Sequence, residues 1–341
     1  MILTYKIRHN QDYSKELGLA EKVAWHGKYT GSRSSADVKH IGLKSMIANQ
    51  ILKKYSNHRK LKNIKSVKLA IPGQGIKVKG NQIYLPCLKL SLDIYFNRNF
   101  DKINQIEIGK EFAYISVSYS EVEQIEPTSF FGVDRNTNGH TLVACNNKTG
   151  KVLKFGKMCN HIHNKYKQIR KQLGKKKKLK KLKSIKNRQQ RIIKNLNHRM
   201  SKGLIERCVK DKSGIVLEDL KQIRQTAKSR KKQRYFLNSW SFYQLAQMIE
   251  YKAKKHGIPI FYVEPQYTSQ RCNECGHIEN ANRKAKLFQC KQCGKVENAD
   301  VNAGFNIAEL HQLGISQFSK DRDLLEGNTD TPREAMVLKS N

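Results

Sequence analysis

The spacing of apolar residues divides the first part of the chain into a short helical segment and a run of strands. Near the start, LTYKI predicts a strand over residues 3–7, and apolar residues at helical spacing follow between Ile41 and Tyr55. From about Ser66 to Pro127, segments such as VKLAI and FAYISVSYS alternate apolar with polar residues and are separated by Gly, Asn and Pro. Such alternation is typical of antiparallel strands, so we predict a small antiparallel barrel or sandwich that the first strand joins.

The remainder of the chain alternates strands with helices. FFGV, TLVACNN and VLKFGK predict three strands, and a long basic helical stretch follows them. The strand GIVLEDL, a helix over residues 233–255, the strand IPIFYVEP and a final helix containing NAGFNIAELHQL come next. Three strands followed by helix, strand, helix, strand and helix is the order of an α/β RNase H-like domain. The tail from about Ser319 is polar, and we expect it to be loosely ordered.

The charge balance limits the class of partner. The chain has 341 residues, with 66 Lys and Arg against 28 Asp and Glu, which gives a net charge of +38. This surplus favours an extended polyanion, most simply nucleic acid, over a merely basic surface such as that of a small ribosomal protein. We expect no membrane span, because no stretch of 18 apolar residues occurs. The start, MILTYKIRHN, becomes polar too soon for a signal peptide.

The basic residues concentrate between Asp134 and Glu206, where no Asp or Glu occurs. A solvated helix face is the usual explanation of a charge run, but without acids no ion pairs can form along the helix. Apolar residues recur at Ile192, Leu196, Met200, Leu204 and Cys208, so one side of a helix is expected to pack inward. We predict that the outer side binds a phosphate backbone. The predicted contacts are Lys175, Lys176, Lys177, Lys178, Lys180, Lys181 and Lys183.

Two CxxC pairs, in CNECG and CKQCG, predict a metal site. The predicted ligands are Cys272, Cys275, Cys290 and Cys293. Each pair can present two thiolates to one tetrahedral Zn²⁺, and four protein ligands leave no open position, so this zinc would be structural. Redox chemistry is the weaker alternative. Without a secretory signal, paired CxxC units favour metal in a reducing compartment over disulfides. We expect Arg271, Lys291 and Lys295 to offset the negative charge of the thiolates.

Three acids come next to predicted elements that can meet at one edge of the domain. Asp134 follows SFFGV, Glu218 follows IVL, and Asp300 begins the last helix. Three carboxylates there would repel one another unless a divalent cation held them, and two Mg²⁺ ions could support phosphodiester hydrolysis. A turn residue and a helix N-terminal acid are the alternatives for Asp134 and Asp300. Strand alternation alone does not decide between Glu218 and Asp219.

Four segments in this order resemble a known family: GVDRNTNG, GIVLEDL, YTSQRCNECG with CKQCG, and NADVNAGFNIA. They are similar to the three RuvC motifs and the zinc ribbon of TnpB (OrfB), the transposon-encoded nucleases related to type V CRISPR effectors. The match covers about residues 129–310. The resemblance implies an α/β RNase H-like (RuvC-like) nuclease domain with an inserted zinc ribbon. It also implies Asp134, Glu218 (not Asp219) and Asp300 as the catalytic, Mg²⁺-binding acids, and the four cysteines as the Zn²⁺ ligands.

The resemblance further implies an RNA-guided DNA endonuclease in the cytoplasm of a prokaryote, associated with the nucleoid. A guide RNA would pair with one strand of a double-stranded target, and the protein would read a short flanking motif. The alternatives are a nuclease-inactive RNA-guided repressor, a compact type V CRISPR effector, and a transposase or accessory protein of transposition. The intact acid triad argues against the first, and no Tyr or Ser recombinase signature supports the last. The short helical insertion departs from the family pattern, so the resemblance does not indicate the length or the specificity of the guide RNA.

The resemblance also implies a small β-barrel (wedge) domain that carries a helical recognition insertion and precedes the nuclease domain. The expected boundaries are the first barrel strand (1–10), the helical insertion (11–65), the barrel (66–127), the first part of the RuvC-like domain (128–267), the zinc ribbon (268–297), the last RuvC-like helix (298–318) and the polar tail (319–341).

Overall fold

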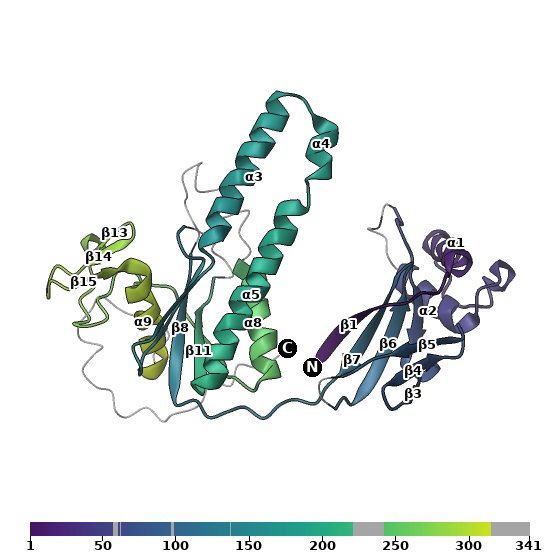
Figure 1. Ribbon diagram of the computed structural model, residues 1–341, viewed down its shortest axis with the longest axis horizontal. Coiled ribbons are helices and arrows are strands. Elements are labelled where there is room, and N and C mark those ends of the chain that lie inside the picture. Colours follow the sequence, from purple (N-terminus) through teal and green to yellow (C-terminus); the bar gives the residue numbers. More distant parts are fainter. Residues whose placement is uncertain (57–60, 62, 97–98, 137, 221–241, 315–341) are drawn as a thin grey trace. The chain divides into compact units, whose positions relative to one another are not determined.

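The computed structural model describes residues 1–56, 61, 63–96, 99–136, 138–220 and 242–314. The chain divides into two compact units, Met1–Glu121 and Val122–Asn341, which are coloured in sequence order in Figure 1. The first part of the helix predicted over residues 233–255 lies outside the described residues, as does the predicted loosely ordered tail. None of the helices within the described residues has the length and apolarity needed to cross a bilayer.

In its described residues, the first unit contains two antiparallel sheets and two α-helices. The larger sheet has the order β1 (Ile2–Arg8), β7 (Phe112–Ser118), β6 (Lys102–Ile108) and β2 (Leu69–Pro72). The smaller sheet consists of β3 (Lys77–Lys79), β4 (Gln82–Leu85) and β5 (Leu90–Asp93). The helices α1 (Ser14–Thr30) and α2 (Ser45–Tyr55) and the 3₁₀ turn η1 (Lys39–Ile41) lie between β1 and β2 in the chain, and η2 (Gly73–Gly75) follows β2.

Burial in this unit follows the alternation seen in the sequence. β7 buries Ala113, Ile115 and Val117 and leaves the residues between them half-exposed, so the strand has one apolar face. Both sheets and both helices contribute to one apolar core. The short strands β3, β4 and β5 pair only with one another among the described residues. The strands that were predicted to form a barrel or sandwich therefore form two separate sheets.

The second unit is built on a five-stranded mixed sheet. Its order is β10 (Val152–Phe155), β9 (Leu142–Asn146), β8 (Ser129–Arg135), β11 (Ser213–Glu218) and β12 (Ile260–Val263). β9 is antiparallel to β8 and β10, whereas β11 is parallel to β8 and β12. Helices α5 (Arg188–Lys210) and α8 (Phe242–Lys255) cover one face, and α9 (Ala299–Gln312) covers the other (Figure 1). This is the α/β arrangement that the order of elements predicted.

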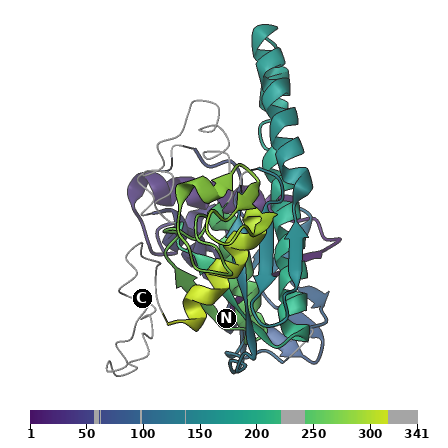
Figure 2. The same cartoon turned by 90° about the vertical axis from the view of Figure 1, so that its left-hand side faces the viewer.

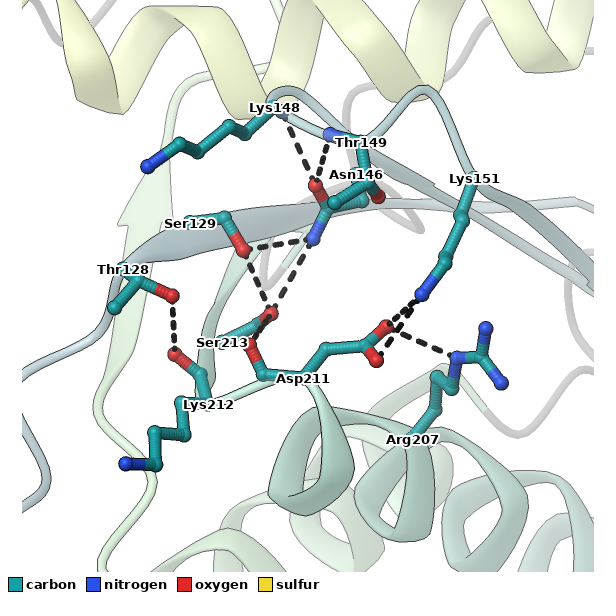
Figure 3. A network of polar contacts seen from close by, with 10 residues as sticks. All are labelled: Thr128, Ser129, Asn146, Lys148, Thr149, Lys151, Arg207, Asp211, Lys212 and Ser213. Carbon is teal, nitrogen blue, oxygen red and sulfur yellow. Dashed lines mark hydrogen bonds and ion pairs between the residues drawn. The ribbon is translucent and has the colours of Figure 1, made fainter.

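A buried polar network sets the register of the central strands (Figure 3). The hydroxyls of Ser129 and Ser213 lie 2.8 Å apart, and Asn146 Nδ2 donates to both, at 2.9 and 3.2 Å. Asn146 Oδ1 accepts two backbone N–H groups of the following turn, so this buried amide is satisfied at both ends. Because Ser129 pairs with Ser213 in a parallel ladder, Asp134 and Glu218 reach the other end of β8 and β11 at the same level.

Helix α9 lies unusually close to strand β8. A Cβ built on Gly132 would come within 2.2 Å of Gly304 O and 2.3 Å of Ala308 N, so any larger residue would push the helix away. The contact holds α9, which carries Asp300 in its first turn, against the strand that carries Asp134.

A helical hairpin projects beyond the sheet in both views (Figures 1 and 2). It consists of α3 (Lys157–Lys175), α4 (Leu179–Ser184) and α5. The buried members of the predicted α5 stripe are Met200, Leu204 and Cys208. Towards the start of α5, however, Ile193 and Asn197 are buried, whereas Ile192 and Leu196 are only half-buried. Strict four-residue spacing drifts around a helix of 3.6 residues per turn, which explains the difference of one position.

A small three-stranded ribbon separates β12 from α9 in the chain. It is formed by β13 (Arg283–Lys284), β14 (Leu287–Gln289) and β15 (Val296–Asn298), which pair antiparallel, and η3 (Asn280–Asn282) precedes it. The ribbon therefore begins after the last strand of the sheet and ends at the first turn of α9.

Candidate active site and metal centre

The three predicted acids lie on the face of the sheet that α9 covers. Val133 and Leu217 pack into the core on the side of α5 and α8. Side chains alternate along a strand, so the next residues, Asp134 and Glu218, point to the opposite face. Asp134, Glu218 and Asp300 are 8%, 7% and 3% exposed, respectively.

Asp219 differs from Glu218 in its surroundings. It follows the end of β11, is half-exposed, and its backbone N–H donates to Val263 O at 2.8 Å. Of the two neighbouring acids, Glu218 is therefore the one on the side of Asp134 and α9, which supports the choice made from the family motif.

Burial and mutual repulsion raise the pKa of two of these acids. Burial, and then the negative charge of Asp300, raise the pKa of Asp134 to about 6. Burial, and then the charge of Asp134, raise the pKa of Glu218 to about 8. Each of these acids therefore lies within the electrostatic field of another, and burial favours the protonated form of Glu218.

Asp134 and Glu218 each accept one side-chain hydrogen bond from the residues that the structure describes. Asn136 Nδ2 donates to Asp134 Oδ2 at 2.8 Å, and Thr268 Oγ1 donates to Glu218 Oε1 at 2.8 Å. Both bonds lower the pKa of the acid that accepts them, against the effect of burial. Among the described residues, no hydrogen bond reaches Asp134 Oδ1 or Glu218 Oε2, so each carboxylate keeps one oxygen for another ligand.

Asp300 is paired with two cations of the ribbon. Lys286 Nζ lies 2.5 Å from Asp300 Oδ2, and an Arg283 guanidinium nitrogen lies 3.4 Å from Oδ1. Both cations come from the β13–β14 hairpin. The three acids do not themselves form a closed set of ligands, because within the described residues the only group of three or more His, Cys, Asp or Glu with ligand atoms all within 4.8 Å consists of cysteines.

The donor set of the acid cluster fits magnesium. Mg²⁺ prefers carboxylate oxygens and is commonly held by one or two of them. Buried carboxylates that raise the pKa of one another would be relieved by a cation between them. The oxygens Asp134 Oδ1 and Glu218 Oε2 are the ones left for such a ligand.

The four predicted cysteines come together: Cys272 and Cys275 precede the ribbon in the chain, and Cys290 and Cys293 lie between β14 and β15. Cys272 Sγ lies 3.7 Å from Cys293 Sγ, and Cys275 Sγ lies 3.5 Å from Cys290 Sγ. A tetrahedral site with Zn–S bonds of about 2.3 Å has S–S edges of about 3.8 Å, so the four sulfurs fit one Zn²⁺.

The two turns that carry the cysteines have the same construction. Each CxxC is followed by a glycine, Gly276 or Gly294, with φ of +75°. Their N–H groups donate to the carbonyls of Cys272 and Cys290 at 3.0 and 3.1 Å. A side chain would strain this left-handed conformation, which explains the glycine in both CNECG and CKQCG.

Arg271 bonds to helix α9. Its guanidinium donates to Glu309 at 2.6 and 3.1 Å and to Asn306 Oδ1 at 3.0 Å, both on α9. A bidentate carboxylate is a strong partner for a buried guanidinium. The expected role of Arg271 in offsetting the charge of the thiolates stays a prediction. Lys295 does lie within the ribbon, where it contacts Asn273 and Glu297.

The sequence motifs predict the acids and the thiolates, but the prediction did not include the polar partners of these residues. Asn136 and Thr268 lie inside the motifs DRNTNG and YTSQRC. Asn136 is two residues from Asp134 and Thr268 is four residues before Cys272, so their positions in the sequence could have marked them as candidate site residues. Lys286 and Arg283 gave no such signal, because only the fold of the ribbon hairpin brings them to Asp300.

The segment that carries the seven predicted lysines, from the end of α3 through α4, lies at the end of the helical hairpin that projects from the sheet (Figure 1). These lysines occupy the end of α3, the connecting turn and α4, and all seven are exposed. No acid within the described part of the chain forms an ion pair with any of them. Their positive charge is therefore available to an external anion.

Comparison with known proteins places these features in a family. Residues 242–307 match the family model described as "Cas12f1-like, TNB domain". A TnpB-like protein of Methanocaldococcus jannaschii is 31% identical over 254 residues, which cover 70% of this chain and 89% of that protein.

Two curated relatives carry the name CRISPR-associated endodeoxyribonuclease Cas12f1. The protein of Sulfoacidibacillus thermotolerans is 38% identical over 137 residues, covering 40% of this chain and 31% of the relative. The protein of Syntrophomonas palmitatica is 32% identical over 194 residues, covering 52% of this chain and 38% of the relative. The matches therefore cover 31% and 38% of the length of these two relatives, which is less than half of each protein.

A solved structure, described as a Cas12f1–sgRNA–target DNA complex, superposes with a TM-score of 0.53 at 18% identity. The match covers 86% of this chain and 80% of that chain, and it shows a shared fold. The M. jannaschii protein is matched over most of its length. On this evidence, together with the RuvC-like motifs and the four-cysteine ribbon, the chain belongs to the TnpB family, which is related to the type V effectors.

Proposed function

We propose that the protein is an RNA-guided, transposon-associated DNA endonuclease that hydrolyses phosphodiester bonds at Asp134, Glu218 and Asp300. The observation that carries the proposal is the gathering of three buried acids on one face of a RuvC-like sheet, in a chain with a net charge of +38. Relatives named as endodeoxyribonucleases and a structural neighbour bound to sgRNA and target DNA support it.

The two kinds of metal ion, magnesium and zinc, would serve different purposes. Asp134, Glu218 and Asp300 would hold Mg²⁺, and the four cysteines would hold one Zn²⁺. When bound, Mg²⁺ supplies a nucleophile from water and stabilises the leaving oxygen of the phosphodiester, in a two-metal arrangement. Zn²⁺ with four protein ligands would contribute folding free energy only.

The residues around the acids would prepare the site for the cation. Burial excludes bulk water from Asp134 and Glu218, and Asn136 and Thr268 hold one oxygen of each carboxylate. Because the pKa of Glu218 is raised to about 8, cation binding at neutral pH would release the Glu218 proton. Lys286 would have to yield its contact with Asp300 at the same time.

Nucleic acid would contact other parts of the chain. The lysines at the tip of the α3–α4 hairpin would bind phosphates without reading bases, because an ammonium is a compact point charge. Pairing with a guide RNA would carry sequence specificity. The two sheets of the first unit would form the wedge domain, α1 and α2 its recognition insertion, and these parts would read the flanking motif.

Sequencing the RNA that binds to the protein tests the proposal. The protein is purified at low salt from its host, and the RNA that accompanies it is sequenced. We expect one major RNA species with a constant part and a segment that matches target DNA. A heterogeneous sample of cellular RNA would contradict a guide function.

A further inference from the structure

Thr268 lies between the sheet and the ribbon in the chain. It follows β12 and precedes Cys272, and the residue is 3% exposed. The hydroxyl carries a single proton, and its shorter contact is with Glu218 Oε1 at 2.8 Å, whereas Pro265 O lies at 3.2 Å. The hydroxyl is therefore directed at one of the acids of the proposed active site.

The backbone of Thr268 is held separately from its side chain. Asn306 Nδ2 donates to Thr268 O at 2.8 Å and to Arg271 O at 2.7 Å, and Asn302 Nδ2 also donates to Arg271 O at 2.7 Å. Asn302 and Asn306 are fully buried in α9, the helix that begins with Asp300. The segment around Thr268 is thus tied to α9 without using the threonine hydroxyl.

Arg271 completes this connection. Its guanidinium donates to Asn306 Oδ1 at 3.0 Å, so the amide of Asn306 is bonded at both its nitrogen and its oxygen. Arg271 also forms an ion pair with Glu309 one turn further along α9. Because a buried network in which every polar group is satisfied is rigid, Thr268 keeps a fixed position relative to Asp300.

We propose that Thr268 is a positioning residue for the metal site, an inference that rests on the function proposed above. Its hydroxyl holds Glu218 by Oε1, so that Oε2, which no described hydrogen bond reaches, faces the cation. The hydrogen bonds of Asn306 and Arg271 hold Thr268 in a fixed position relative to Asp300, which lies at the start of α9. The fold needs only the backbone of Thr268, whereas the metal site needs its hydroxyl.

The test compares Thr268→Val, which keeps the branched shape, with Thr268→Ser, which keeps the hydroxyl. Thr141→Val is the matched control, because Thr141 is also buried but donates to a backbone carbonyl, Gly156 O, at 3.0 Å. Mn²⁺ binding to the zinc-loaded full chain, freed of nucleic acid in high salt, is measured by electron paramagnetic resonance. Binding that remains in the Asp300→Ala variant is subtracted.

Loss of a hydrogen bond that orients a metal ligand commonly weakens metal binding by about tenfold or more. We expect Thr268→Val to raise the Kd for Mn²⁺ by about tenfold, and Thr268→Ser and Thr141→Val to leave it near the wild-type value. Zinc content should be unchanged in all three variants. Wild-type affinity in Thr268→Val, or equal losses in the Val and Ser variants, would overturn this inference alone. A wild-type chain that binds no Mn²⁺ would overturn the proposed function as well.

Discussion

Lys286 Nζ lies 2.5 Å from Asp300 Oδ2, so a side chain of the ribbon hairpin reaches the acid that begins α9. Asp300 is almost fully buried, whereas about a third of the Lys286 side chain is exposed. A buried carboxylate is stabilised by a positive partner, and the ribbon supplies one here. The ribbon and the acid cluster are therefore linked electrostatically, although the strands of the ribbon do not pair with the five-stranded sheet.

This contact predicts that Lys286 competes with a divalent cation for Asp300. In Lys286→Met, the metal-free chain should melt at a lower temperature, and Mg²⁺ should raise its melting temperature by more than it raises that of the wild type. Lys284→Met, an exposed neighbour in the same hairpin, is the control and should behave as the wild type. Equal stabilisation by Mg²⁺ in the wild type and in Lys286→Met would show that Lys286 does not compete.

The raised pKa values predict how the stability of the metal-free chain depends on pH. The pKa values of folded Asp134 and Glu218, about 6 and about 8, lie above their ordinary values of 3.8 and 4.5. The folded state therefore binds more protons than the unfolded state in this window, and the free energy of unfolding falls as the pH rises from about 4 to about 8. Urea unfolding at pH 5 and pH 8, without Mg²⁺, should show this loss.

Glu218→Gln removes the larger of the two shifts and should make the unfolding free energy less dependent on pH. The variant should be more stable than the wild type at pH 8 and closer to it at pH 5. A pH dependence as steep as that of the wild type would mean that Glu218 is not the group that titrates.

The four-cysteine cluster predicts a structural dependence on zinc. Ser substitution at Cys272 or Cys293 should lower the zinc content towards zero and destabilise the second unit, because structural zinc contributes folding free energy directly. Cys87→Ser, which alters a half-exposed cysteine far from the ribbon in sequence, is the control. Zinc content by mass spectrometry and the melting temperature are the measurements. Loss of activity with normal zinc content and normal melting would indicate a redox or catalytic role instead.

The hairpin lysines predict a salt-dependent contribution to nucleic-acid binding. Neutralising Lys175, Lys176, Lys177 and Lys178 together should weaken binding of guide RNA or target DNA without changing which sequence is cut. Each lost phosphate contact flattens the plot of log affinity against log salt by about 0.7 to 0.9, so four contacts flatten it by roughly three units. An unchanged slope for both RNA and DNA would mean that these lysines only face solvent. A changed cleavage sequence would mean that the protein itself reads bases there.

Much of the second unit could be predicted because its elements are locally encoded. The apolar runs FFGV and GIVL identify β8 and β11, and Asp134 and Glu218 follow at the ends of both runs. Asp134 and Glu218 lie side by side because Ser129 pairs with Ser213 in the parallel ladder. The order of elements predicts that the two strands are parallel, but it does not predict which residues pair. The cysteine pairs were equally local, because two CxxCG turns define their own geometry.

The parts that could not be predicted depend on contacts between distant segments. Thr268 reaches Glu218 across 50 positions, and Arg271 reaches Glu309 across 38. Neither pairing follows from hydrophobic periodicity. The division of the first-unit strands into two sheets also depends on pairing partners, which alternation within each strand does not identify.

The choice between the neighbouring acids Glu218 and Asp219 can be tested by paired substitutions. Glu218→Ala should abolish Mg²⁺-dependent cleavage, whereas Asp219→Ala should leave it largely intact, because only Glu218 points to the α9 face with Asp134. The reverse result, with cleavage retained in Glu218→Ala and lost in Asp219→Ala, would mean that the site is built around the other carboxylate.

Cleavage of a guided target by the wild type and the acid variants tests the central claim most directly. The protein with its co-purified RNA is mixed, in Mg²⁺, with double-stranded DNA that matches the RNA and with DNA of scrambled sequence. We predict that the wild type cuts only the matched DNA, and that Asp134→Ala, Glu218→Ala and Asp300→Ala still bind it but do not cut it, because these acids would contact metal rather than phosphate. Cutting that ignores the RNA sequence, or undiminished cutting by Asp300→Ala, would contradict the account.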